Sequence, residues 1–235
     1  TAVLTLGTPI GTGDTPVVRT VASPANTKDN ASTPNTISGT LTSTPIDGIS
    51  PTVSISSLTT SPTKVSPISV TATFSETVTG FELTDTTVTN GVASNLVGGG
   101  STYTFDLTPT TDGPVTVKIL ENTALDVASN QNSVSNTFSI VYDSVPPTVD
   151  LTKDHDDLIV RDANTVVVTA TFNETMFSAP TINIDVGSGV DADILSAVMT
   201  GSGTTWTYSW NVPSSHDGLA TLTVAGVDLA GNAYQ

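Results

Sequence analysis

Short stretches of alternating apolar and polar residues recur along the chain. In Thr102–Leu107, the apolar side chains of Tyr103, Phe105 and Leu107 alternate with polar ones, and Val70–Phe74 follows the same pattern. A period of two places alternate side chains on one face of a strand. No stretch of ten residues carries apolar positions at helical spacing. The pattern predicts an all-β protein.

Turn residues separate these stretches, notably Asn90-Gly91 and the triple glycine Gly98–Gly100. Asn-Gly and glycine-rich turns between alternating segments are typical of hairpins, and many short strands separated by turns favour a β-sandwich. In the first half, the predicted strands are Val53–Ser57, Ile68–Phe74, Phe81–Leu83, Thr87–Thr89, Ala93–Val97, Thr102–Leu107, Val115–Leu120 and Thr137–Tyr142. In the second half, they are Val166–Phe172, Thr181–Val186, Ala192–Met199, Trp206–Trp210 and Ala220–Val224.

The second half repeats the first. The segment VTATFSET that begins at Val70 recurs as VTATFNET at Val168, and DVASN at Asp126 recurs as DLAGN at Asp228. Matching landmarks in the same order indicate a tandem repeat. The sequence therefore predicts two immunoglobulin-like sandwiches, residues 50–145 and 146–235, the second without its last strand. Residues 1–49 are predicted to be a strand-rich N-terminal extension or the end of a preceding domain.

Composition narrows the possible partners. The 235 residues include 22 acidic and six basic side chains, which gives a net charge of −16. A nucleic-acid backbone or an anionic membrane repels such a surface, whereas divalent cations are attracted to it. There is no cysteine, and no apolar run approaches the roughly 20 residues that cross a bilayer. We expect no nucleic-acid partner and no membrane insertion, but self-association or contact with neighbouring repeats of the same chain.

The first repeat carries several short motifs in a fixed order: FSETVTGF, an Asn-Gly turn, TYTF, DGPVTV and DVASN. In these motifs it resembles the bacterial Ig-like repeats of large surface adhesins. The second repeat departs from the pattern, because Met176-Phe177-Ser178 replaces VTGF and the Asn-Gly turn is missing. The resemblance implies a secreted structural protein on the bacterial cell surface, a spacer or stalk repeat of an adhesin or extracellular filament.

Carboxylates recur at matching places in both repeats. In an Ig-like sandwich, the end of the second strand, the last loop and the incoming linker meet at one pole. Carboxylate and amide oxygens are the ligands that Ca²⁺ prefers. We therefore predict a structural Ca²⁺ site in each repeat, formed by Asp47, Glu76, Asp126 and Asn130 in the first and by Asp143, Glu174, Asp228 and Asn232 in the second. The alternative is a tight turn in which the aspartate only caps backbone N–H groups.

The sequence offers no catalytic motif. Its two histidines, His155 and His216, lie in different expected loops, and it contains neither an HExxH nor a GxSxG segment. Trp206 and Trp210 share one face of a strand and are expected to fill the second core. We expect no enzymatic activity.

Both ends of the chain leave alternatives open. The segment Ala2, Val3, Leu4, Thr5 and Leu6 reads as a strand with no repeat of its own to join. It, or a neighbouring segment, would complete the second repeat of another subunit by strand donation, which builds a filament. Otherwise the chain is a window of a longer tandem array. A third interpretation is an accessory β-module of a secreted hydrolase.

Overall fold

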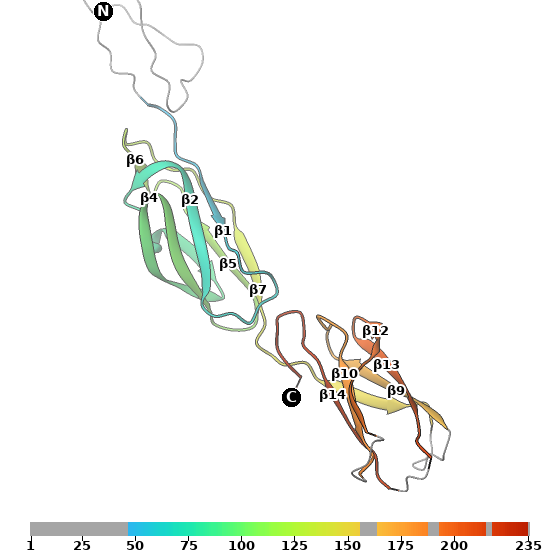
Figure 1. Ribbon diagram of the computed structural model, residues 1–235. Helices are drawn as coiled ribbons and strands as arrows, with labels where there is room; N and C mark the ends of the chain where they lie inside the picture. The colour runs from blue at the N-terminus through green and yellow to red at the C-terminus, as the bar shows by residue number, and fades with distance from the viewer. Residues whose placement is uncertain (1–46, 156–163, 188–192, 215–217, 235) are drawn as a thin grey trace, which may run out of the picture.

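The computed structural model describes residues 47–155, 164–187, 193–214 and 218–234. They are nearly all β and form two sandwiches arranged end to end (Figure 1). We call strands β1 to β7 the first unit and strands β8 to β14 the second unit. Each unit has its own hydrophobic core, and the two cores share no residue. The prediction of Ig-like β-sandwiches is confirmed, while the domain boundaries stay predictions.

The described strands are divided between the two units. The first unit contains β1 (Val53–Ser56), β2 (Ile68–Thr79), β3 (Thr86–Thr89), β4 (Gly91–Pro109), β5 (Gly113–Ile119), β6 (Leu125–Asp126) and β7 (Phe138–Tyr142), with the short 3₁₀ helix η1 (Leu83–Asp85). The second unit contains β8 (Val149–Lys153), β9 (Thr165–Phe172), β10 (Thr181–Asp185), β11 (Ile194–Val198), β12 (Thr200–Ser202), β13 (Thr205–Asn211) and β14 (Thr221–Ala225). Among the described residues, no helix has the length and apolar character of a membrane span.

Each unit is built from two antiparallel sheets. In the first unit, a sheet of order β1-β2-β4, with β6 beside β2, belongs with a second sheet of order β3-β5-β7. In the second unit, the orders are β12-β13-β9-β8 and β11-β10-β14. The two units differ at one edge: β5 pairs with both β3 and β7, whereas among the described residues β14 pairs with β10 alone.

The first core is closed by three aromatic rings. Phe74, Phe81 and Tyr103 contact one another edge to face, with ring centroids 5.2 to 5.8 Å apart. The hydroxyl of Tyr103 donates a buried hydrogen bond to the backbone carbonyl of Val78, 3.1 Å away. Rings in this geometry add to the stability that apolar burial provides, and the hydroxyl ties β4 to the end of β2.

The second core contains both tryptophans. Trp206 and Trp210 lie on the same face of β13, and their exposed fractions are only 8% and 6%. They pack in one cluster with Ile182, Ile184 and Phe172, among others. The expectation that these two side chains fill the second core is confirmed, which leaves their faces unavailable for stacking on a ligand.

The predicted strand Phe81–Leu83 is wrong. Gly80 has a backbone φ of +88°, which turns the chain, and η1 begins two residues after Phe81. The side chain of Asp85 accepts a hydrogen bond from the backbone N–H of Glu82 at 2.8 Å, so local capping competes with strand pairing here. Phe81 still points into the core, with an exposed fraction of 5%. Alternation identified the buried side chain and misidentified the backbone around it.

Candidate metal centres

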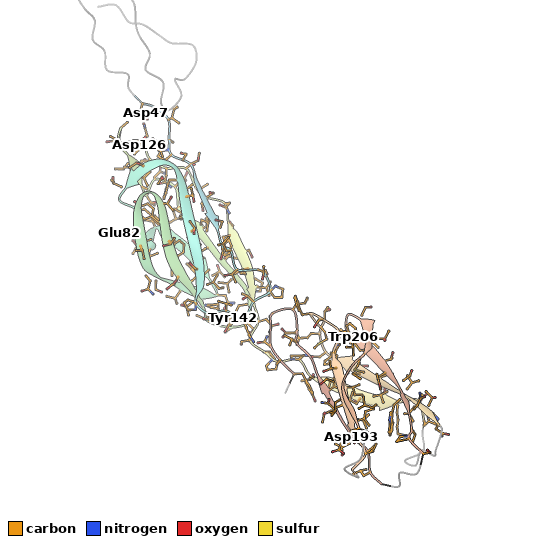
Figure 2. All side chains as sticks on the ribbon, viewed as in Figure 1. Asp47, Glu82, Asp126, Tyr142, Asp193 and Trp206 are labelled. Carbon is orange, nitrogen blue, oxygen red and sulfur yellow. The ribbon has the colours of Figure 1, made fainter. Side chains whose placement is uncertain are left out.

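Three carboxylates of the first unit meet at its N-terminal pole. Asp47 lies in the segment that enters the unit, Glu76 lies on β2 and Asp126 lies on β6. One carboxylate oxygen of each lies within 4.8 Å of the others. The register of β2 against β4 shifts between Thr73 and Val78, and this irregularity spans Glu76. Such irregularities re-aim side chains out of the regular alternation. Figure 2 shows Asp47 and Asp126 together at the end of the first unit that points away from the second.

The second unit repeats this arrangement at the junction with the first. Asp143 belongs to the linker, Glu174 follows β9, and Asp228 opens the loop after β14. Their nearest carboxylate oxygens also lie within 4.8 Å of one another. In both clusters, the first aspartate and the glutamate are half-buried, and the aspartate of the last loop is buried. The sequence repeat is therefore also a repeat of side-chain geometry.

The last loop of each unit is held by the same set of hydrogen bonds. In the first unit, the backbone N–H and the side-chain amide of Asn130 both donate to the carboxylate of Asp126, each at 2.8 Å. In the second unit, Asn232 donates to Asp228 in the same way, at 2.8 and 2.9 Å. Each asparagine thus fixes both oxygens of its aspartate before any ion is present.

The incoming linker is tied to this loop in both units. The side-chain amide of Asn130 donates to the backbone carbonyl of Asp47 at 3.1 Å, and that of Asn232 donates to Asp143 at 3.0 Å. The carboxylates of both linker aspartates accept a bond from the backbone N–H two residues later, at 3.0 Å for Asp47 and 3.1 Å for Asp143. The entry of the chain and the last loop therefore form one rigid frame around the carboxylates.

Desolvation and the crowding of three carboxylates raise the pKa of the glutamate in each cluster. Desolvation, followed by the negative charges of Asp126 and Asp47, raises the pKa of Glu76 above its ordinary value. Desolvation, Asp143 and Asp228 raise the pKa of Glu174 in the same order. Burial opposes ionisation of Asp126, but the hydrogen bonds from Asn130 and the neighbouring backbone outweigh it and lower the pKa of Asp126. Each cluster therefore contains a glutamate whose ionisation is disfavoured by desolvation and by two neighbouring carboxylates.

A divalent cation fits what the clusters lack. The Oε1 atom of Glu76 is buried without a hydrogen-bond partner. Within the described part of the chain, no lysine or arginine forms a salt bridge with any of the six carboxylates. Oxygens that share one Ca²⁺ at 2.3–2.6 Å lie at most about 5 Å apart, which matches the spacing in both clusters. Asp47, Glu76 and Asp126 would hold one ion, and Asp143, Glu174 and Asp228 a second.

The two asparagines have a defined place beside these clusters. Their amide nitrogens face the aspartates and the linker carbonyls, so they position the carboxylates; the predicted ligand role of their side-chain oxygens stays a prediction. The strand-donation residues Ala2, Val3, Leu4, Thr5 and Leu6 lie outside the described residues. Sequence reasoning missed Lys64, whose backbone and side chain both reach the second acidic loop. It lies in a loop without periodicity, and only the fold brings it there.

Residues 47–142 match the family model described as the bacterial Ig-like domain. The first unit is therefore similar to the bacterial Ig-like domain. The match begins at Asp47 and ends one residue before Asp143, so the matched residues include all three carboxylates of the first cluster. No curated protein matches the chain.

The second unit lies beyond the matched residues and shares the two-sheet architecture and the acidic pole of the first unit. Bacterial Ig-like domains are typically structural modules without catalytic activity, and they are usually found outside the cell or on its surface.

Proposed function

We propose that this chain is an extracellular structural protein, an Ig-like spacer of a bacterial surface adhesin or filament, stiffened by Ca²⁺ where one unit joins the next. The observation that carries the proposal is the place of Asp143. This single linker residue donates its backbone N–H to Thr63 of the first unit at 2.9 Å, accepts a bond from Asn232 of the second, and contributes its carboxylate to the second cluster.

A cation at this position would act mechanically. It would offset two of the three negative charges that otherwise repel one another, and it would bind the linker to the loop that follows β14. A linker fixed at both ends transmits force along the axis of the two units, which is what a stalk requires. Pro146 and Pro147 restrict the linker backbone further, because proline fixes φ and limits the residue before it.

The test is the melting temperature of the whole chain in Ca²⁺ and in chelator. We expect chelator to lower it, because an ion that binds only the folded state stabilises that state. The double variant Asp143→Ala/Asp228→Ala should lose the part of this effect that comes from the second unit, and Asp47→Ala/Asp126→Ala the part from the first. A control that removes two exposed carboxylates outside the clusters, Glu121→Ala/Asp150→Ala, should respond to chelator as the wild type does. Equal melting temperatures of the wild type in both conditions would remove the metal from the account.

A second candidate function is a self-assembling filament subunit. The observation that favours it is an edge of β14 that is unpaired among the described residues. Within this part of the chain, β14 pairs with β10 alone, whereas β5 of the first unit pairs with both β3 and β7. Ala220 and Leu222 are correspondingly half-buried, although Val115 and Val117 on β5 have an exposed fraction of 0%. An exposed strand edge is a template for another chain, and the N-terminal strand Ala2–Leu6 of a second copy is the proposed donor.

Deletion of residues 1–10 separates the two candidates. A filament built by this donor strand becomes monomeric when the segment is removed, which analytical ultracentrifugation measures directly. Multimers that persist after the deletion exclude donation from this end. A full-length chain that is monomeric at all concentrations favours the spacer.

A further inference from the structure

Lys64 of the first unit forms hydrogen bonds with the second unit across the junction. The backbone N–H of Lys64, in the loop between β1 and β2, donates to the carbonyl of Ala230 at 3.3 Å, and its ammonium group donates to the carbonyl of Gly231. Both acceptors belong to the loop that Asp228 and Asn232 close. Figure 1 shows that the loop after β14 returns to the side of the second unit that faces the first.

Lys64 is held in place by the residue before it. Thr63 has an exposed fraction of 4%, and its N–H donates to the carbonyl of Val141 at 3.0 Å. Its own carbonyl accepts the N–H of Asp143 at 2.9 Å. The loop that presents Lys64 is thus bound to the end of β7 and to the linker, so Lys64 moves with the first unit as a rigid part of it.

The loop from Asp228 to Asn232 has a glycine at the point where Lys64 approaches it. Gly231 has a φ of +94°, a conformation that side chains disfavour. Its backbone lies against the methylene groups of Lys64: a β-carbon built on Gly231 would lie 3.5 Å from the Cε of Lys64. The contact therefore combines a backbone hydrogen bond with a charge-assisted hydrogen bond.

The first unit contains the same loop, and among the described residues no lysine donates to its carbonyls. Ser129 stands where the second unit has Gly231, with a φ of +72°, and both Ala128 and Ser129 are exposed, whereas Ala230 and Gly231 are half-buried. Asn130 is likewise more exposed than Asn232. Because the internal hydrogen bonds of the two loops match, the first loop is a built-in control for what Lys64 adds.

We propose that Lys64 is a clasp that couples cation binding in the second cluster to the orientation of the first unit. The inference rests on the proposed Ca²⁺ binding. An ion bound by Asp143, Glu174 and Asp228 holds the loop from Asp228 to Asn232 in place. Lys64 of the first unit donates hydrogen bonds to two carbonyls of this loop. Binding of the ion therefore restricts the angle between the two units. Without the ion, repulsion among the three carboxylates weakens the hydrogen bonds that hold the loop, and the linker between the units becomes more mobile. Coupling of this kind requires one structural element whose conformation depends on both ion binding and the contact with Lys64. Here that element is the loop from Asp228 to Asn232.

Amide hydrogen exchange at Lys64 tests the coupling. We expect the amide of Lys64 to exchange at least roughly fivefold more slowly in Ca²⁺ than in chelator, because the net stability of one hydrogen bond changes the opening equilibrium by about this factor. The amide of Thr63, bonded within the first unit, should be unchanged. Asp228→Asn should abolish the response at Lys64, and the matched variant Asp126→Asn should leave it intact.

A distance measurement supplies a second readout. The chain has no cysteine, so Thr104→Cys on β4 and Ser209→Cys on β13, both exposed, accept a pair of spin labels. Ca²⁺ should narrow the distance distribution between the units, and Lys64→Met should restore a broad one with Ca²⁺ present. Lys118→Met on β5, away from the junction, should behave as the wild type. If calorimetry finds no bound Ca²⁺, the proposed function fails. If two ions bind and neither the Lys64 amide nor the distance distribution responds, the clasp alone is wrong.

Discussion

The side-chain amide of Asn232 lies 3.0 Å from the backbone carbonyl of Asp143 and donates a hydrogen bond to it across 89 residues of sequence. The same amide also donates to the carboxylate of Asp228 at 2.9 Å. One asparagine therefore connects the linker to the acidic loop. Its counterpart Asn130 makes the same two contacts at the far end of the first unit.

Asn232→Ala removes both contacts and leaves a buried carboxylate with fewer donors. We expect a loss of about 2 kcal/mol in the free energy of unfolding of the second unit, because hydrogen bonds to charged groups exceed neutral ones. Asn130→Ala should cost the first unit less, since Asn130 is more exposed. Denaturant titration followed by tryptophan fluorescence reports the second unit, which contains both tryptophans. Equal losses in the two units would contradict this.

The backbone of the two loops supports a matched pair of substitutions. Gly231→Ala places a side chain at a φ of +94° and should destabilise the second unit by about 1 kcal/mol. Ser129→Gly relieves the same conformation, at +72°, and should leave the first unit equally or more stable. Thermal unfolding of both variants measures this. A destabilising Ser129→Gly would mean that the serine side chain has a structural role of its own.

The pH dependence of the cation-free protein follows from the two glutamates. A carboxyl group whose pKa is raised in the folded state binds its proton more tightly there, so the cost of its charge is present at neutral pH and is relieved as the pH falls toward the raised pKa. In chelator, we expect the melting temperature to rise as the pH falls from 7 toward the ordinary glutamate value of 4.5.

Glu76→Gln/Glu174→Gln is the control for that trend. It should raise the melting temperature in chelator at pH 7, flatten its pH dependence, and abolish the gain from added Ca²⁺. The lowered pKa of Asp126 works in the opposite direction only below its ordinary value of 3.8, outside this window. A pH profile unchanged by the double substitution would assign the trend to the overall charge of −16 instead.

Tyr103→Phe tests the tie between β4 and the end of β2. The ring contacts with Phe74 and Phe81 remain, but the bond to the Val78 carbonyl is lost. We expect a loss of about 1 kcal/mol in the stability of the first unit, measured by urea titration with circular dichroism. Because Val78 follows the irregular part of β2, Ca²⁺ affinity of the first cluster should fall as well. Unchanged stability would show that water replaces the hydroxyl without cost.

The sequence predicted the repeat, the sandwich and the set of carboxylates that meet at each pole, because these depend on alternation and on matching positions. It did not predict η1, where the bond between Glu82 and Asp85 overrides strand pairing. It missed Lys64 for a different reason: the partners of Lys64 lie more than 160 residues away in the second unit, and no local pattern marks a residue that acts across a junction. The predicted donor strand Ala2–Leu6 falls outside the described residues.

The central claim is that each acidic cluster holds one cation. Isothermal titration of the metal-depleted chain with Ca²⁺ tests it most directly. We expect two ions per chain, reduced to one by Asp126→Asn and to one by Asp228→Asn. A titration without heat, in a protein whose circular dichroism shows folded β-sheet, would contradict it.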